Sequence, residues 1–153
     1  MGTKMAHGVR SYDVDGRCFS WEPPSGLRYS TAAIDVERKD SRVSTVLQRR
    51  FRLPPHAFLK RWTATEAVAK VIDRPILAFV REQGLLNTGE PCWSHFGDVW
   101  YRTVTDRERW ISVAIRPVGD TSHIDDIAEP GTITELVPRA EKPNGTPRPD
   151  LEG

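Results

Sequence analysis

Long apolar runs and cysteines are scarce in this sequence, and each scarcity excludes a class of protein. Apolar stretches such as residues 76–80 fall far short of the ~20 residues that a membrane-spanning helix needs. The first ten residues lack the apolar segment of a secretory signal. The cysteines, Cys18 and Cys92, stand far apart and supply no disulfide framework. We therefore expect a cytoplasmic protein with two buried free thiols and no membrane contact.

The charge of the chain is unevenly distributed, although its net value is only +1. Residues 1–116 carry 19 Lys or Arg and 13 Asp or Glu, whereas residues 117–153 carry 3 and 8. A basic body and an acidic C-terminal part are physically different regions, so the net charge of the whole chain describes neither of them. Prolines and glycines accumulate after position 137, so we expect residues 138–153 to form a disordered, acidic, proline-rich tail.

The order of sequence patterns predicts one small α+β domain over residues 17–137, preceded by a loose start at 1–16. Strand-like patterns, expected to pair antiparallel, cover residues 17–21, 27–38 and 43–53, and residues 132–137 offer a weaker one. A helical segment is predicted over about 55–86 and a β-hairpin over about 99–116.

The middle of the chain divides into three expected helices at 56–62, 63–72 and 73–84. Thr63 or Thr65 would cap the second helix and Asp73 the third. Short helices followed by a hairpin with a charged tip match the outline of a winged helix-turn-helix, in which a helix enters the major groove and the hairpin reaches nearby phosphates. A plain α+β packing of the same elements is equally compatible with the sequence.

The most distinctive feature is a stretch of 25 residues, 41–65, that contains no carboxylate and six basic side chains. Phe51, Phe58 and Trp62 lie among these cations, a composition that suits phosphate backbones and stacked bases. We therefore predict a nucleic-acid-binding module, such as a winged-helix-like bacterial or phage regulator, that needs no catalytic residue, metal or cofactor. The candidate contacts are Arg42, Arg49, Arg50, Arg52, Lys60, Arg61, Arg74, Arg81, Arg107 and Arg109.

The same residues allow a second interpretation, in which the aromatics are core residues and the partner is another protein. Five tryptophans are many for this length, and tryptophan with arginine is typical of protein interfaces. Trp93 is the tryptophan expected to be exposed, because its loop has few apolar neighbours. A non-catalytic interaction or inhibitor module therefore stays open as an alternative.

A third interpretation comes from the segment that contains Asp35, Glu37 and Lys39. Alternate residues of a strand share a face, so the three side chains would project together. Carboxylates beside a lysine can hold Mg²⁺ and polarise a water, with Asp13 and Asp15 as further candidate ligands. This pattern predicts a Mg²⁺-dependent nuclease, although charges on a solvent-facing edge strand explain it equally.

Cys92 and His95 have the spacing of half a zinc site, with Glu90 and Asp98 nearby. No second paired motif completes the site, and spacing alone does not establish a Cys–His nucleophile. A structural cysteine and a loop histidine are the expected roles.

Overall fold

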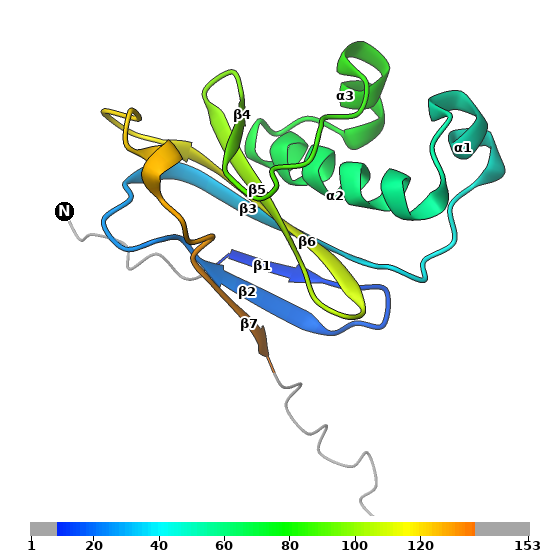
Figure 1. The fold of residues 1–153 in the computed structure, drawn as a ribbon, viewed down its shortest axis with the longest axis horizontal. Helices are drawn as coiled ribbons and strands as arrows, with labels where there is room; N and C mark the ends of the chain where they lie inside the picture. Colours follow the sequence, from blue (N-terminus) through cyan, green and yellow to red (C-terminus); the bar gives the residue numbers. More distant parts are fainter. Residues whose placement is uncertain (1–8, 137–153) are drawn as a thin grey trace, which may run out of the picture.

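A four-stranded antiparallel sheet forms the middle layer of the protein (Figure 1). Its strands lie in the order β3 (Tyr29–Arg38), β6 (Arg109–Pro117), β5 (Val99–Thr105) and β4 (Ser94–Phe96). The computed structural model describes residues 9–136. The predicted α+β class is confirmed, and the hairpin expected over 99–116 is present as β5 and β6.

A three-stranded antiparallel sheet covers one face of the larger sheet. It contains β1 (Val9–Tyr12), β2 (Cys18–Glu22) and β7 (Thr132–Leu136), with β2 in the centre. Alternation along β2 buries Phe19 and Trp21, which pack against Ile34 and Val36 of β3. Strand β1 forms inside the segment expected to be loose, because its residues pair with β2.

Three helices cover the opposite face of the larger sheet (Figure 1). They are α1 (Thr45–Phe51), α2 (Pro55–Val71) and α3 (Ile76–Gln83), and a short 3-10 turn, η1 (Ile124–Asp126), precedes β7. Helix α2 lies on the sheet through small side chains that meet small side chains of β3 and β6, so the backbones approach closely. This contact includes Ala64, Ala67, Val68, Ala33 and Ala114.

The strand predicted over residues 43–53 is wrong, since residues 45–51 form α1. The side-chain oxygen of Ser44 accepts a hydrogen bond from the Val46 N–H and caps the helix. Val43, Leu47 and Phe51 are spaced by four, so they share a face in a helix as well as in a strand. In the folded protein they pack against Phe58 and its neighbours.

The two helices expected at 56–62 and 63–72 are one continuous helix, α2. The hydroxyls of Thr63 and Thr65 donate to the carbonyls of Leu59 and Arg61 within this helix, so neither threonine acts as an N-cap. The hairpin is not a projecting wing, because β5 and β6 lie in the interior of the sheet. The boundaries expected for a winged helix-turn-helix are therefore wrong.

Further predictions from the sequence concern Trp93, the two cysteines and the C-terminal tail. Trp93 is buried, not exposed, because its ring packs near that of Trp21 and its indole N–H donates to the Glu129 carbonyl. Both cysteines are free, but Cys18 is half-buried and Cys92 is exposed. The tail predicted at 138–153 lies outside the described residues. Among the helices of residues 9–136, none has the length and apolar character to cross a bilayer.

Candidate functional site

Three carboxylates converge between the edge strand β3 and helix α2. Asp35 and Glu37 share the face of β3 that looks toward α2, while Ile34 and Val36 point into the core on the other side. Glu66 comes from α2, and one oxygen from each carboxylate lies within 4.8 Å of the other two. Across residues 9–136, this is the one group of three or more potential metal-ligating side chains that comes together.

Lys70 completes the cluster. It follows Glu66 by one helical turn, which places both side chains on the same side of α2. Its ammonium group donates to Oδ1 of Asp35 over 3.0 Å and to the backbone carbonyl of Ile34 over 3.1 Å. The second carboxylate oxygen of Asp35, Oδ2, is buried and has no hydrogen-bond partner.

The surroundings of the two β3 carboxyls favour their neutral forms. Burial is the largest influence on Asp35 and raises its pKa to about 8, an effect that the Glu66 charge increases and the Lys70 charge opposes. Burial likewise raises the pKa of Glu37 to about 7, again with a contribution from Glu66. Near neutral pH the cluster therefore holds protons that ordinary carboxylates would have released.

The lysine expected to join Asp35 and Glu37 does not do so. The ammonium of Lys39 donates to the carbonyl of Asp106 and lies 4.6 Å from the centre of the Trp110 ring. Lys70 occupies the position that the sequence assigned to Lys39.

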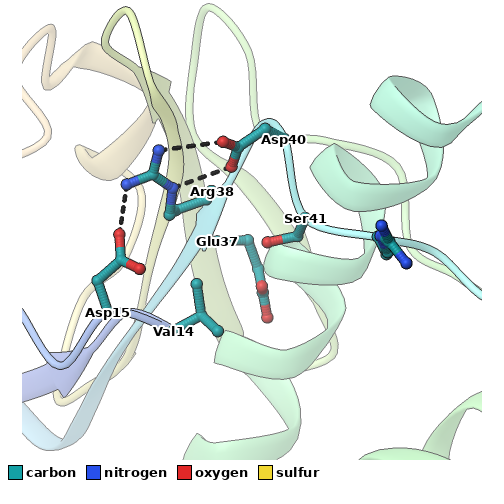
Figure 2. Close-up of a pocket in the computed structure, with 7 residues that line it drawn as sticks. Val14, Asp15, Glu37, Arg38, Asp40 and Ser41 are labelled. Carbon is teal, nitrogen blue, oxygen red and sulfur yellow. Dashed lines mark hydrogen bonds and ion pairs between the residues drawn. The ribbon is translucent and has the colours of Figure 1, made fainter.

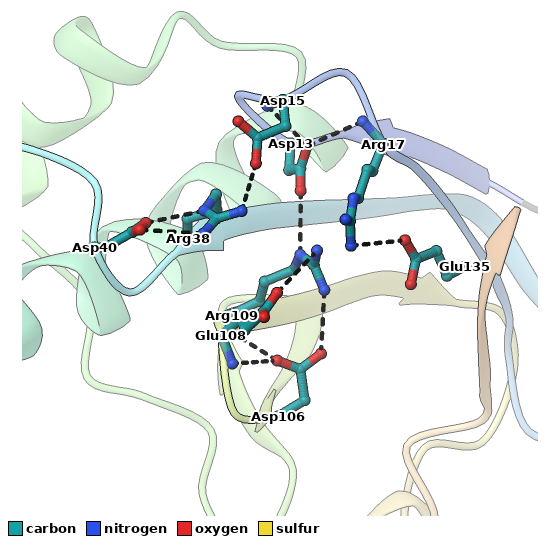
Figure 3. A network of polar contacts seen from close by, with 9 residues as sticks. All are labelled: Asp13, Asp15, Arg17, Arg38, Asp40, Asp106, Glu108, Arg109 and Glu135. Atoms are coloured by element: carbon teal, nitrogen blue, oxygen red, sulfur yellow. Dashed lines mark hydrogen bonds and ion pairs between the residues drawn. The ribbon is translucent and has the colours of Figure 1, made fainter. Parts of the chain in front are cut away.

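Asp13 and Asp15 are also engaged elsewhere, as Figure 3 shows. Asp13 accepts from the buried Arg109 guanidinium over 3.1 Å, and Asp15 pairs with Arg38. Neither carboxylate reaches the cluster of Asp35, Glu37 and Glu66. The expectation that they complete a metal site with Asp35 and Glu37 is wrong.

Glu37 connects the carboxylate cluster to the surface. It lines a cleft of about 520 Å³ together with Val14, Asp15, Arg38, Asp40, Ser41 and Arg42. Figure 2 shows Arg38 held between Asp15 and Asp40, whereas Glu37 points away from these ion pairs. Arg42 and Glu37 also line an adjoining cleft of about 230 Å³ that extends to Leu47 of α1 and Trp62 of α2.

Helix α1 carries most of the predicted basic contacts that remain available to a partner. Arg49 and Arg50 are exposed on this helix, Arg52 is exposed at its C-terminal end, and Arg42 is exposed just before it. Within residues 9–136, none of these four arginines forms an ion pair. We refer to Arg42, Arg49, Arg50 and Arg52 as the α1 basic surface.

Other side chains predicted to contact nucleic acid are instead engaged by interactions within the protein. Lys60 pairs with Glu90 and lies over the Trp110 ring. Arg61 donates to the carbonyls of Leu85 and Leu86, which ties α2 to the segment after α3.

Two more arginines of the predicted set are held by carboxylates, and two are exposed. Arg74 pairs with Glu82 over 2.6 Å, and the side chain of Arg109 is only 5% exposed between Asp13 and the β5–β6 turn. Arg81 and Arg107 are exposed, but they lie on α3 and on the β5–β6 turn and are not part of the α1 basic surface. Of the predicted set, four arginines are exposed on or next to α1 in the chain, and the others are engaged within the fold or lie on other elements.

The acidic excess of the C-terminal part lies within the folded residues. Asp120, Asp125, Asp126, Glu129 and Glu135 account for it, whereas residues 138–153 contain three acidic and three basic side chains. This corrects the expectation of an acidic tail. The segment containing η1, drawn in orange, lies at the far end of the molecule from α1 (Figure 1). The α1 basic surface is therefore not neutralised by these carboxylates.

Within residues 9–136, Cys92 and His95 belong to no group of three or more potential metal ligands. Cys92 is exposed in the loop before β4, and the ring of His95 lies 4.9 Å from that of Trp100.

Glu66 and Lys70 are the two site residues that sequence reasoning missed. A usable signal was present, because Glu66 is a lone acid among Thr65, Ala67 and Val68, all of which are buried. A charged residue in such a helical segment calls for a partner. The sequence did not identify β3 as the element that supplies it.

Comparison with family models, with curated protein sequences and with solved structures finds no match to this chain. The α1 basic surface and the carboxylate cluster are therefore the features that bear on function.

Proposed function

We propose that this protein binds nucleic acid through the α1 basic surface. The observation that carries the proposal is that four exposed arginines on and just before one helix have no carboxylate partner within residues 9–136. An arginine that makes no internal ion pair can contact a phosphate without first losing a partner. Clustered cations of this kind bind the phosphate backbone with little dependence on sequence.

The surroundings of α1 support the same ligand. No carboxylate occurs between Asp40 and Glu66, so α1 and the first part of α2 contribute no negative charge of their own. The nearby aromatic rings of Phe51, Phe58 and Trp62 pack against one another, with Phe58 and Trp62 stacked at 5.4 Å. These rings therefore stabilise α1, and their packing against one another favours backbone contacts over base stacking.

The test is equilibrium binding of short fluorescent DNA and RNA strands across a salt series, in the presence of a chelator. Wild-type protein should bind near 50 mM salt, and log K should fall linearly with log salt. Replacing Arg49, Arg50 and Arg52 together by glutamine should lower the salt slope by about two to three, because each lost phosphate contact removes nearly one released counterion.

A matched control removes the same charge from another face. Arg10 on β1, Arg17 between β1 and β2, and Arg28 just before β3 are exposed and lie outside α1, so their replacement by glutamine should leave binding nearly unchanged. Equal losses in both triple variants would mean that net charge alone matters and would overturn the assignment to α1. Absence of binding by wild-type protein, together with partners that survive nuclease treatment in a pull-down, would favour the protein-interaction alternative.

A further inference from the structure

The carboxylate cluster between β3 and α2 has a feature that an internal ion-pair network does not explain. Asp35 is only 4% exposed, and its Oδ2 atom has no hydrogen-bond donor. A buried charged or polar atom without a partner is costly, and such atoms are rare in folded proteins. Oδ2 belongs to the carboxylate that already meets Glu37 and Glu66. A group shared by all three acids would supply the missing partner.

The charges of the cluster define that group. When all three acids are ionised, Lys70 neutralises only one of them, which leaves two negative charges in a half-buried space. The charged side chains that act on Asp35 are Glu66, Lys70 and Glu37, and no arginine is among them. One divalent cation would balance the cluster without a further side chain, as bound cations do in other carboxylate sites.

The spacing of the three carboxylate oxygens can be compared with the size of a shared cation. Two ligands of one ion can be no further apart than twice the metal–oxygen distance, which is about 4.2 Å for Mg²⁺ and about 5 Å for Ca²⁺. The oxygens of Asp35, Glu37 and Glu66 lie within 4.8 Å of one another, a bound that meets the Ca²⁺ limit, whereas Mg²⁺ requires the carboxylates to draw closer together. With three carboxylates and neither cysteine nor histidine, the donor set suits a hard cation and not zinc.

We propose that Asp35, Glu37 and Glu66 bind one hard divalent cation of the Mg²⁺ type, with the Asp35 Oδ2 atom as a ligand. Lys70 holds the other oxygen of Asp35 and so orients that carboxylate toward the ion. The small number of protein ligands at this site favours Mg²⁺ over Ca²⁺, because Mg²⁺ retains several waters whereas Ca²⁺ takes six to eight oxygens. The inference is independent of nucleic-acid binding, since none of its residues belongs to the α1 basic surface.

The location of the site gives the cation an access route. Glu37 lines both clefts, and Arg42 lines them with it. An ion held by Glu37 would therefore lie beside the arginine that begins the α1 basic surface. A phosphate contacted by Arg42 would approach the same region, which is the arrangement in which a cation can neutralise a phosphate oxygen.

The test is calorimetric titration of the chelator-treated full chain with MgCl₂, MnCl₂ and CaCl₂ at about pH 8, where fewer protons compete for the carboxylates than at neutral pH. Wild-type protein should bind one Mg²⁺ or Mn²⁺ and gain thermal stability as the concentration rises. Asp35→Asn and Glu66→Gln should each weaken binding by about tenfold or more, since even indirect partners of a metal contribute that much.

Glu22→Gln is the matched control, because Glu22 is an exposed acid outside the cluster. It should bind Mg²⁺ as wild-type protein does. Circular dichroism of Asp35→Asn and Glu66→Gln in chelator establishes that each variant is folded before it is titrated. Two results would overturn the inference: absence of saturable binding by folded wild-type protein, or equal affinity in wild-type protein and both folded cluster variants. Preferential binding of Ca²⁺ would contradict the Mg²⁺ assignment.

Discussion

The ammonium of Lys70 lies 3.0 Å from Oδ1 of Asp35 and joins the C-terminal part of α2 to the edge strand β3. The pair is unequal in exposure, because the Asp35 side chain is 6% exposed and that of Lys70 is 40% exposed. Lys70 therefore retains contact with solvent while it holds a buried carboxylate.

Stability in chelator should depend on pH through Asp35 and Glu37. Their pKa values in the folded protein are raised to about 8 and about 7, so the folded state holds protons that the unfolded chain releases near pH 4. The free energy of unfolding should therefore fall as the pH rises from about 4 to about 8. Urea unfolding of wild-type protein at several pH values measures this slope.

Asp35→Asn should reduce that slope, because asparagine resembles the neutral acid and has no proton to lose. Above about pH 8 the variant should be more stable than wild-type protein in chelator. A wild-type slope that the substitution leaves unchanged would show that other groups cause the pH dependence.

Removal of the Lys70 charge should strengthen cation binding. The ammonium repels a cation bound to the same carboxylate, so Lys70→Gln should bind Mg²⁺ about threefold more tightly or better. The same substitution should lower stability in chelator, because Asp35 loses its one ionic partner. Weaker Mg²⁺ binding by a folded Lys70→Gln protein would contradict this prediction and would indicate that positioning of Asp35 outweighs repulsion.

The ion pair between Asp13 and Arg109 should be important for stability. Both side chains are almost fully buried, and Asp13→Asn leaves the Arg109 guanidinium with only the more exposed Asp106 and Glu108 as ionic partners, so the substitution should cost about 2 kcal/mol or more. Arg17→Gln, which breaks an exposed pair with Glu135, should cost less than about 1 kcal/mol. Urea unfolding compares the two variants, and equal losses would be inconsistent with the burial of Asp13.

The same pair predicts sensitivity to acid. Burial raises the pKa of Asp13, but hydrogen bonds from the Arg17 N–H and from Arg109 lower it by more, so the net pKa is below its usual value. The stabilising contribution is therefore present above about pH 4 and is lost as the pH falls through the lowered pKa. In Asp13→Asn this acid-induced loss should be smaller than in wild-type protein.

If the cation and a bound nucleic acid meet at the cleft, Mg²⁺-dependent hydrolysis should follow. Water would add to phosphorus as the bond to the leaving oxygen breaks, with the cation stabilising the charge that develops. Cleavage of RNA and plasmid should require Mg²⁺ and stop in chelator. Glu37→Gln should be slower by about tenfold or more, with unchanged strand binding in chelator. Equal cleavage by the variant would rule out this site, and no cleavage by wild-type protein would leave binding without hydrolysis.

The sequence alone determined the periodic elements. Apolar and polar residues alternate over 27–38 and over the hairpin, and prolines and glycines mark the ends of these segments. This pattern predicted β3, β5 and β6, because a strand has a period of two regardless of its neighbours. It failed at 43–53 because apolar residues four apart satisfy both a strand and a helix, and the cap at Ser44 decides for the helix.

Only the tertiary structure decided which charged residues meet. Asp35 and Glu37 were recognisable as neighbours on one face of a strand, whereas their contacts with Glu66 and Lys70 depend on how α2 crosses the sheet. That crossing is set by packing of small side chains such as Ala67 and Ala114, which carries no local signal in the sequence. Likewise, only the fold distinguishes the exposed arginines of α1 from Arg109, because burial depends on contacts between distant segments.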